Sequence, residues 1–241
     1  MKLLLTGHEG FVGSNLLPIL EKDHEVFCID RKSGLDLVDC DLEYDVDAVI
    51  HLAGLSGVRD SMDKPHQYWM NNVLASTRLF AQFKDKRVIY ASSSTAAEPE
   101  LNPYALSKKT LEKLAPIDSV GLRFTTVYGG KNSRDNMLIP KILQNNVKFI
   151  HTNHSRDFVH VDDVCDAIIM CLHKDIKGVF DVGSGKSHKL LDIMNFCKIK
   201  GFEQKLGGPN ERLDNKADIE VLEQHGWRPK IDLYDYLGER I

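Results

Sequence analysis

Hydrophobic residues gather in short runs through the first half of the chain, and polar or glycine residues separate these runs. Short apolar runs with such boundaries are typical of strands that are buried on both faces of a parallel sheet. The pattern predicts strands at residues 2–6, 25–30, 47–54, 87–93 and 120–125, with a further one at 179–183.

Segments with helical periodicity lie between the predicted strands. They cover residues 13–22, residues 66–83, and Pro103 to about Leu114; Pro18 lies inside the first and removes a backbone donor there. Repeated strand–helix alternation implies right-handed crossover connections. We therefore predict an α/β fold, a doubly wound parallel Rossmann sheet.

The alternation of strands and helices loosens after residue 130. We expect residues 1–130 to form the core of the fold, and residues 157–183 to return to it. Residues 131–156 and 184–241 are then expected to form a small, shortened C-terminal substrate lobe over the carboxyl ends of the strands.

Composition narrows the class of protein. The chain has 241 residues and a formal net charge of −4, so no broad basic field attracts nucleic acid or a membrane surface, and we expect neither as a partner. The five cysteines are scattered and lack metal-ligand spacing, as in free thiols of a reducing compartment. The apolar run at the N-terminus is too short for a signal peptide, and we expect a cytoplasmic protein.

The stretch TGHEGFVG places Gly7, Gly10 and Gly13 directly after the first predicted strand. Glycines permit a tight turn and a close approach of the backbone, and the N-terminus of the following helix favours a pyrophosphate. Asp30 ends the second predicted strand, where a carboxylate can bind ribose hydroxyls and repel a 2′-phosphate. This arrangement predicts that the protein binds NAD in preference to NADP. The positive charge of the adjacent Arg31 weakens that preference.

A second glycine-containing stretch, GSGKS at residues 183–187, resembles the end of a loop that binds nucleoside triphosphates. That motif needs a glycine five residues before Gly185, and position 180 is a phenylalanine. We interpret the stretch as a turn that leads from the last strand into the lobe.

The stretch NPYALSKK contains Tyr104 and Lys108, one helical turn apart. Asn102 is a suitable N-cap and Pro103 suits the first helical position. Tyrosine has a pKa near 10, and a base that works near neutrality needs about three pKa units less. A nearby ammonium group and a positively charged nicotinamide can both lower the pKa of a tyrosine, and the serines at 92–94 end the preceding strand, where a hydroxyl can bind the reacting oxygen.

The ordered motifs resemble the extended short-chain dehydrogenases/reductases, and among them the NAD-dependent epimerase/dehydratase family that acts on nucleotide sugars. The motifs are TGxxGxxG, HLAG at 51–54, the serine run, YxxxK, LRFTTVYGG at 122–130, RDFVHVDDV at 156–164 and GVFDVGSGKS. The resemblance covers nearly the whole chain. It implies that Ser93, Tyr104 and Lys108 are catalytic, with Tyr104 as the base and Lys108 also binding the nicotinamide ribose.

The resemblance also implies a set of cofactor-binding residues. Asp36 and Leu37 resemble an acid–aliphatic pair that flanks adenine, with Asp41 and Leu42 as a second candidate, and Asn72 matches an asparagine that braces the site. From the residues alone, a solvated polar position of an amphipathic helix is the preferred interpretation of Asn72. The complete expected set is Gly7, Gly10, Phe11, Val12, Gly13, Asp30, Arg31, Asp36, Leu37, Leu52, Ala53, Gly54, Asn72, Tyr104 and Lys108.

Departures from the family pattern limit the reaction. Dehydrating relatives carry Asp-Glu just after the catalytic Ser/Thr, whereas this chain has Ser94 and Thr95. Without a carboxyl group there, elimination lacks its general acid and base. We therefore predict a nucleotide-sugar 4-epimerase that works through a 4-keto intermediate; a nucleotide-4-ketosugar reductase that consumes NAD(P)H, and a non-catalytic NAD-binding scaffold or sensor, remain alternatives.

Four further positions are expected to contact the nucleotide-diphosphate sugar. RFTTVYG resembles UDP-glucuronate 4-epimerases at Thr126, and Arg134 matches an arginine that follows in those relatives. Arg156 and Arg212 are candidates for the diphosphate, because a guanidinium group binds phosphate oxygens in bidentate fashion. His151 and His154, in HTNH, have no further ligand at a suitable spacing, and we predict no metal site.

The chain is shorter than most family members at two places. The segment from Asp30 to Asp47 is too brief for the usual helix and strand, and only 11 residues lead from Ser93 to Tyr104, where relatives carry a substrate-covering loop. A more exposed sugar, or cover from a partner subunit, is expected. Because relatives pair through the helix that bears Tyr and Lys, we expect a homodimer.

Overall fold

The computed structural model describes residues 1–241 and contains a six-stranded parallel sheet with the order β2-β1-β3-β4-β5-β9. Each predicted strand forms, and the register of every neighbouring pair is parallel. The strands are β1 (Lys2–Thr6), β2 (Glu25–Ile29), β3 (Ala48–His51), β4 (Arg87–Ser93), β5 (Val120–Phe124) and β9 (Gly178–Val182). The predicted doubly wound fold is confirmed.

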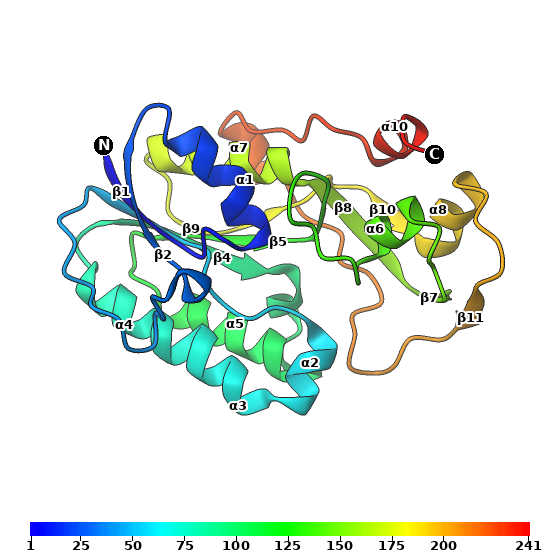
Figure 1. Cartoon of the computed structure of the whole chain (residues 1–241), viewed down its shortest axis with the longest axis horizontal. Helices are drawn as coiled ribbons and strands as arrows, with labels where there is room; N and C mark the ends of the chain where they lie inside the picture. Colours follow the sequence, from blue (N-terminus) through cyan, green and yellow to red (C-terminus); the bar gives the residue numbers. More distant parts are fainter.

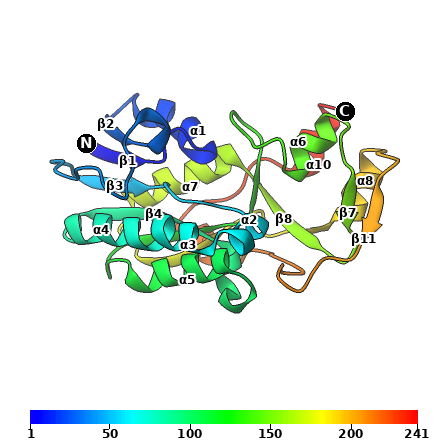
Figure 2. The same ribbon diagram turned by 60° about the horizontal axis from the view of Figure 1, so that its bottom comes forward.

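Helices cover both faces of this sheet, as Figures 1 and 2 show. On one face, α1 (Phe11–Leu20) and α7 (Val161–His173) pack on alternate strand residues such as Leu3 and Leu5. On the other face, α4 (Ala75–Gln82) and α5 (Pro103–Leu114) lie over residues such as Leu4. The period-two alternation of the strands therefore divides their side chains between two hydrophobic cores.

The predicted helix at 66–83 forms as three joined pieces. These are α3 (Pro65–Tyr68), a π-helical turn (Trp69–Leu74) and α4, preceded by the short α2 (Val58–Asp63). A π-helical turn widens the helix by one residue and is frequent at functional sites. Here it contains Asn72, whose side chain is buried.

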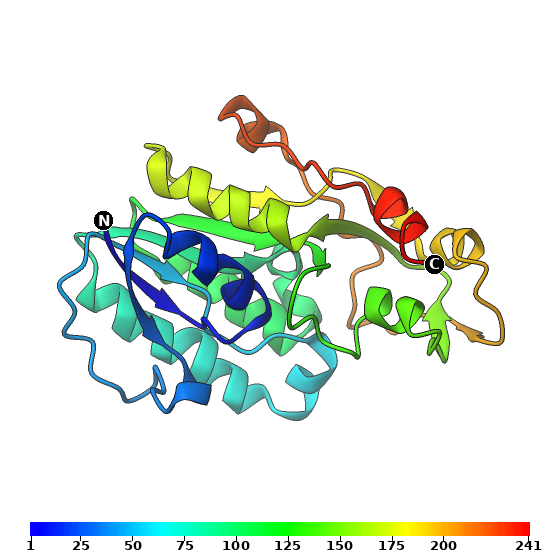
Figure 3. The same cartoon turned by 45° about the horizontal axis from the view of Figure 1, so that its top comes forward.

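A third hydrophobic core lies in the lobe on the right of Figure 3 and includes Ile139, Phe158, Met194 and Leu237. Here β8 pairs with β6 in parallel and with β10 in antiparallel fashion, forming a three-stranded sheet separate from the main one. The elements of the lobe are β6 (Thr126–Tyr128), α6 (Leu138–Leu143), β7 (Phe149–His151), β8 (Ser155–His160), β10 (Ser187–Lys189), α8 (Leu190–Phe196), β11 (Glu203–Lys205) and α10 (Leu233–Gly238).

One part of the C-terminal segment packs on the main core instead of the lobe. Leu222, in α9 (Glu220–Gln224), and Trp227 belong to the same core as α1 and α7, and the indole of Trp227 donates to the carbonyl of Asp163 at 2.9 Å. We therefore propose that the chain divides into a main core and a small lobe, as the sequence predicts, except that residues near 217–230 belong to the main core.

Both places where the chain is short are compact turns. Between β2 and β3 only Arg31–Ser33 form a 3-10 turn, and two more 3-10 turns, Ser94–Ala97 and Pro99–Leu101, connect β4 to α5. β2 is consequently the edge strand of the sheet. None of the helices combines the length and the apolar character that crossing a membrane requires.

Candidate active site

A cavity of about 680 Å³ opens at the carboxyl ends of the sheet strands and continues to the lobe. Crevices at this edge of a doubly wound sheet are where such folds bind ligands. The cavity brings together most of the residues that the sequence singles out. Those that line it are Gly7, Gly10, Phe11, Val12, Gly13, Leu52, Gly54, Ser93, Tyr104, Lys108, Thr126, Arg134, Arg156 and Arg212.

The glycine turn after β1 has no room for side chains. Gly7 has a left-handed φ of 77°, and a Cβ there would lie 2.6 Å from the backbone nitrogen of Ala53. A Cβ on Gly13 would overlap the carbonyl oxygen of Gly7. No side chain caps the first turn of α1, which begins after Gly10, so its amide groups face the cavity as an uncapped, electropositive helix end. This cradle fits a pyrophosphate.

The residues expected at the adenosine end lie outside the cavity lining. The Asp30 carboxylate accepts from the backbone nitrogens of Glu9 and Lys32, at 3.0 and 2.9 Å, and so ties the glycine turn to β2. Asp36 accepts from the amide of Val38, and the side chain of Leu37 is buried in the second core. Asp30, Arg31, Asp36, Leu37 and Ala53 remain predictions as cofactor-binding residues.

Asn72 holds the loop that follows β3. Its Oδ1 accepts from the amide of Leu55 at 2.7 Å, and its Nδ2 donates to the carbonyl of Leu55 and to the Ser107 hydroxyl. Only 1% of Asn72 is exposed, so the interpretation as a solvated helix position is wrong. The side chain braces Gly54 and Leu55 against α5, beside the Nζ of Lys108.

The start of α5 forms as the sequence predicts. Asn102 Oδ1 accepts from the amide of Ala105 at 2.8 Å, and Pro103 occupies the first turn. Tyr104 is therefore fixed at the cavity wall, where its ring packs edge-on against Tyr68 with centroids 5.9 Å apart. Ser93 ends β4 opposite, and its Oγ accepts from the Thr95 hydroxyl at 3.0 Å.

Burial dominates the electrostatics of the predicted proton-transfer pair. It raises the pKa of Tyr104, against the lowering effects of a hydrogen bond with Ser93 and of the Arg134 charge. The lowering of this pKa by Lys108 and a bound nicotinamide stays a prediction. Burial also lowers the pKa of Lys108 to about 8, with Glu112 acting in the opposite direction, and its Nζ donates to the carbonyl of Ala91 at 2.9 Å.

The arginines predicted for substrate are held at the far end of the cavity by polar contacts. Arg134 donates to the hydroxyl and the carbonyl of Ser56. Arg212 donates to Glu98 Oε1 at 2.7 Å and to the Ser94 carbonyl at 2.6 Å. Arg134 is therefore held at the loop that follows β3, and Arg212 at the turn that follows β4.

Asn215 was not predicted from the sequence, although it lines the cavity. Its Nδ2 lies 3.3 Å from Thr126 Oγ1 and 3.4 Å from Ser94 Oγ, and its Oδ1 accepts from the amide of Asp157. Arg59 and Glu211 were missed as well. All three lie in stretches without a regular apolar pattern, so only the folded chain brings them to the site.

The GSGKS stretch connects β9 to β10, as interpreted. The buried carboxylate of Asp157 accepts from the amides of Ser184 and Gly185, at 2.6 and 2.9 Å, and from the amide of Ala217. The amides that a phosphate loop would present to its ligand are thus bonded to a carboxylate of the same chain.

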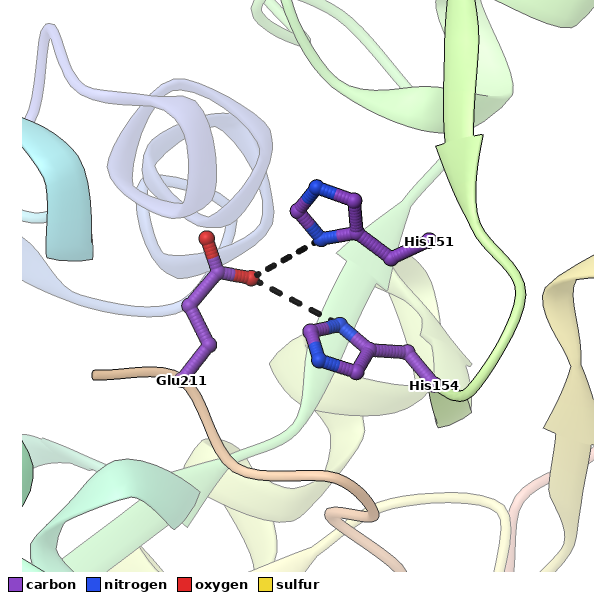
Figure 4. A group of neighbouring side chains, drawn as sticks. All are labelled: His151, His154 and Glu211. Carbon is purple, nitrogen blue, oxygen red and sulfur yellow. Dashed lines mark ion pairs between the residues drawn. The ribbon is translucent and has the colours of Figure 1, made fainter. Parts of the chain in front are cut away.

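His151 and His154 gain a third neighbour that their spacing does not reveal. Glu211 Oε2 lies 3.7 Å from His151 Nδ1 and 3.6 Å from His154 Nδ1, and Figure 4 shows the carboxylate pointing between the two rings. These three side chains have ligand atoms within 4.8 Å of one another. The expectation that HTNH has no third potential ligand is therefore wrong.

The fold and the cavity define a dinucleotide-binding enzyme of the short-chain dehydrogenase/reductase type: a parallel sheet, a glycine turn on an uncapped helix, and Ser, Tyr and Lys at the adjoining strand end and helix. The model of the NAD dependent epimerase/dehydratase family matches residues 3–183. The chain belongs to this family, and NAD is its cofactor.

Similar proteins cover nearly all of the chain. A putative UDP-glucose 4-epimerase of Methanocaldococcus jannaschii is 27% identical over 96% of the chain and 94% of its own length. Among solved structures, the UDP-glucuronic acid 4-epimerase of Bacillus cereus, in complex with UDP-glucuronic acid and NAD, has a TM-score of 0.87 and 26% identity, covering 100% and 98% of the two chains. The UDP-N-acetylglucosamine 4-epimerase of Methanobrevibacter ruminantium, in complex with UDP-N-acetylmuramic acid, has a TM-score of 0.85 and 28% identity, covering 99% and 96%.

Proposed function

We propose that the chain is an NAD-dependent nucleotide-sugar 4-epimerase in which Ser93, Tyr104 and Lys108 carry the chemistry. The observation that supports this most directly is that all three side chains line the same cavity as the glycine turn. The curated and solved relatives described above are 4-epimerases of UDP-sugars, which favours the same reaction here.

The chain's own residues suit proton transfer at the sugar C4 oxygen. Tyr104, as phenolate, takes the proton from the 4-hydroxyl, and Ser93 hydrogen-bonds the same oxygen. NAD held by the glycine turn and Lys108 would supply reversible hydride transfer at the sugar C4, by way of the 4-keto intermediate. Lys108, whose Nζ lies near Gly54 and Asn72, is proposed to bind the nicotinamide ribose.

The substrate is proposed to be a UDP-sugar with its diphosphate near Arg156 and Arg212, both of which line the cavity. Thr126 and Arg134 favour a sugar that carries a carboxylate, and the B. cereus neighbour was solved with UDP-glucuronic acid. Elimination is disfavoured, because Ser94 and Thr95 supply no carboxyl group behind Ser93.

The test is conversion of UDP-glucuronic acid, UDP-glucose and UDP-N-acetylglucosamine by purified protein supplied with NAD and no NADH. We expect the C4 epimer of one of them, detected by NMR. Turnover only with stoichiometric NADH and a 4-ketosugar would identify a reductase instead. Absence of binding by every UDP-sugar, with NAD still bound, would identify a non-catalytic scaffold.

A second copy of the chain is the proposed partner. Trp69, Leu74, Leu106 and Leu114 are large apolar side chains that are each between 44% and 49% exposed, on the helices α3 to α5 that lie together in Figure 2. An exposed apolar face of this kind favours association. Light scattering should give twice the monomer mass for the wild type and the monomer mass for Leu106→Asp; a monomeric wild type would contradict this. A cytoplasmic location stays a prediction.

A further inference from the structure

One end of the cavity holds a carboxylate of the protein itself. Glu211, with 19% of its side chain exposed, lies among positively charged or imidazole side chains from three separate segments. Arg59 Nε donates to Glu211 Oε1 at 3.2 Å, and Arg156 NH2 lies 3.6 Å from Oε2. His151 and His154 complete the surroundings, as Figure 4 shows. We call these five residues the Glu211 cluster.

Three hydrogen bonds orient the Arg156 side chain toward this carboxylate. Its NH1 donates to the carbonyls of Ser155 and Leu213, at 2.7 and 3.2 Å, and its NH2 donates to His154 Nδ1 at 3.0 Å. A guanidinium group can only donate, so His154 Nδ1 accepts, and the imidazole carries its proton on Nε2. Burial, followed by the charge of Arg156, lowers the pKa of His154 to about 4, in agreement with a neutral ring.

A metal ion is a poor occupant of the Glu211 cluster, although two imidazoles and a carboxylate are common zinc ligands. The lone pair of His154 Nδ1 that a metal needs is already used by Arg156. Arg59 adds a second guanidinium group at the carboxylate, and this group also lies 5.6 Å from the ring centroid of Phe149. The two guanidinium groups carry two positive charges against the one negative charge of Glu211, which favours an anion at this place.

We propose that Glu211 is an internal competitor for the anionic group of the nucleotide ligand, holding Arg156 and Arg59 until that group displaces its carboxylate. This inference rests on the proposed function, because it takes the diphosphate of a UDP-sugar as the incoming anion. A diphosphate carries more negative charge and more acceptor oxygens than one carboxylate, so it displaces the Glu211 carboxylate from the two arginines. Glu211 is thus a positioning residue that weakens binding and speeds release.

The exchange needs rotation of one side chain and no movement of the loop. The backbone on either side of Glu211 is fixed, because the Asn210 carbonyl accepts from Asn102 Nδ2 at 3.0 Å and the Arg212 side chain is bonded to Glu98 and Ser94. Arg156 keeps its two backbone carbonyl acceptors throughout.

The test is calorimetric titration of UDP into the NAD-loaded full chain. Glu211→Gln keeps the shape of the side chain and removes its charge, so we expect UDP to bind about tenfold more tightly, with a slower off-rate in stopped-flow displacement. Glu211→Ala should act in the same direction. The matched control is Glu43→Gln, an equal change of charge at an exposed position outside the cavity, which should leave UDP affinity as it is in wild type.

A merely structural role for Glu211 predicts that both variants bind UDP more weakly than wild type does. That result, or UDP affinity equal to wild type in both variants, would overturn the inference. The proposed function would still stand in either case, because wild type binds UDP. If wild type and variants all fail to bind UDP, both proposals fall. Titration with Zn²⁺ is the second arm: stoichiometric binding by wild type that Glu211→Gln and His151→Ala both abolish would show a metal site and overturn the competitor role.

Discussion

The two walls of the cavity are built in different ways. The cofactor wall includes the glycine turn, where backbone lies directly against backbone, as at Gly7 and Gly13. The substrate wall is made of charged side chains such as Arg59, Arg156 and Glu211, which come from segments more than 50 residues apart in the chain.

Because of this difference, the two walls should respond differently to amino-acid substitutions. A wall of close-packed backbone fails when a single Cβ is added, because neither neighbour can move aside cheaply. A wall of long charged side chains keeps its shape after a substitution and changes its affinity for anions. Substitutions on the two sides should therefore be distinguishable by whether they affect NAD or the nucleotide sugar.

Tyr104 lies where the two walls meet, and Tyr104→Phe should have the largest effect. We expect turnover to fall by at least about 10³-fold, with NAD affinity close to wild type, because only the proton-transfer group is lost. Product formation by NMR and cofactor binding by fluorescence give the two readouts. Tyr44→Phe, on a ring that packs against Phe27 away from the cavity, is the control, and an active Tyr104→Phe enzyme would refute the role.

Gly13→Ala should break the cofactor wall alone. The new Cβ overlaps the carbonyl oxygen of Gly7, and relieving this costs about 1–3 kcal/mol, or up to about 100-fold in NAD affinity. The matched control is Gly208→Ala, since no atom lies within 4 Å of a Cβ built there. Equal NAD affinity in both variants would show that the glycine turn does not hold the cofactor.

Arg156→Ala should break the substrate wall alone. Losing a bidentate contact to a diphosphate costs about 2 kcal/mol, so we expect KM for the UDP-sugar to rise about thirtyfold with NAD affinity as in wild type. Steady-state kinetics with saturating NAD measures this. A fall in kcat at constant KM would place Arg156 in the chemistry instead of in binding.

Lys108→Met should change the stability of the folded protein, by an amount similar to the effect of Arg156→Ala on binding. Burial lowers the pKa of Lys108 to about 8, so keeping it charged costs the folded protein at pH 7, and the inactive variant should be more stable by about 2 kcal/mol. Above pH 8 folded wild type releases this proton while the unfolded chain keeps it. Wild type therefore gains stability up to about pH 10.5, and the difference in Tm should shrink; a constant difference would contradict the assignment.

Sequence reasoning succeeded where structure is locally determined. The bounds Pro103 to Leu114 are reproduced by α5, because an asparagine N-cap and a proline at the first helical position act within four residues. The six strands of the sheet follow from apolar runs that need burial on both faces.

Sequence reasoning failed where a contact joins distant segments. Glu211 meets His151 and His154 because the loop after β11 returns to β7, and no local pattern encodes that return. Burial likewise raises the pKa of Tyr104, an effect that the spacing to Lys108 in the sequence does not reveal. Both depend on the completed tertiary structure.

Asn102 joins the helix that carries Tyr104 to the loop that carries Glu211. Its Oδ1 caps the helix that carries Tyr104, and its Nδ2 donates to the carbonyl of Asn210 beside Glu211. A single amide group therefore couples the two halves mechanically, so that a change in the loop is felt at the first turn of α5. Free energies measured for substitutions in these two segments should not sum, and this non-additivity will be carried by one side chain that touches neither ligand.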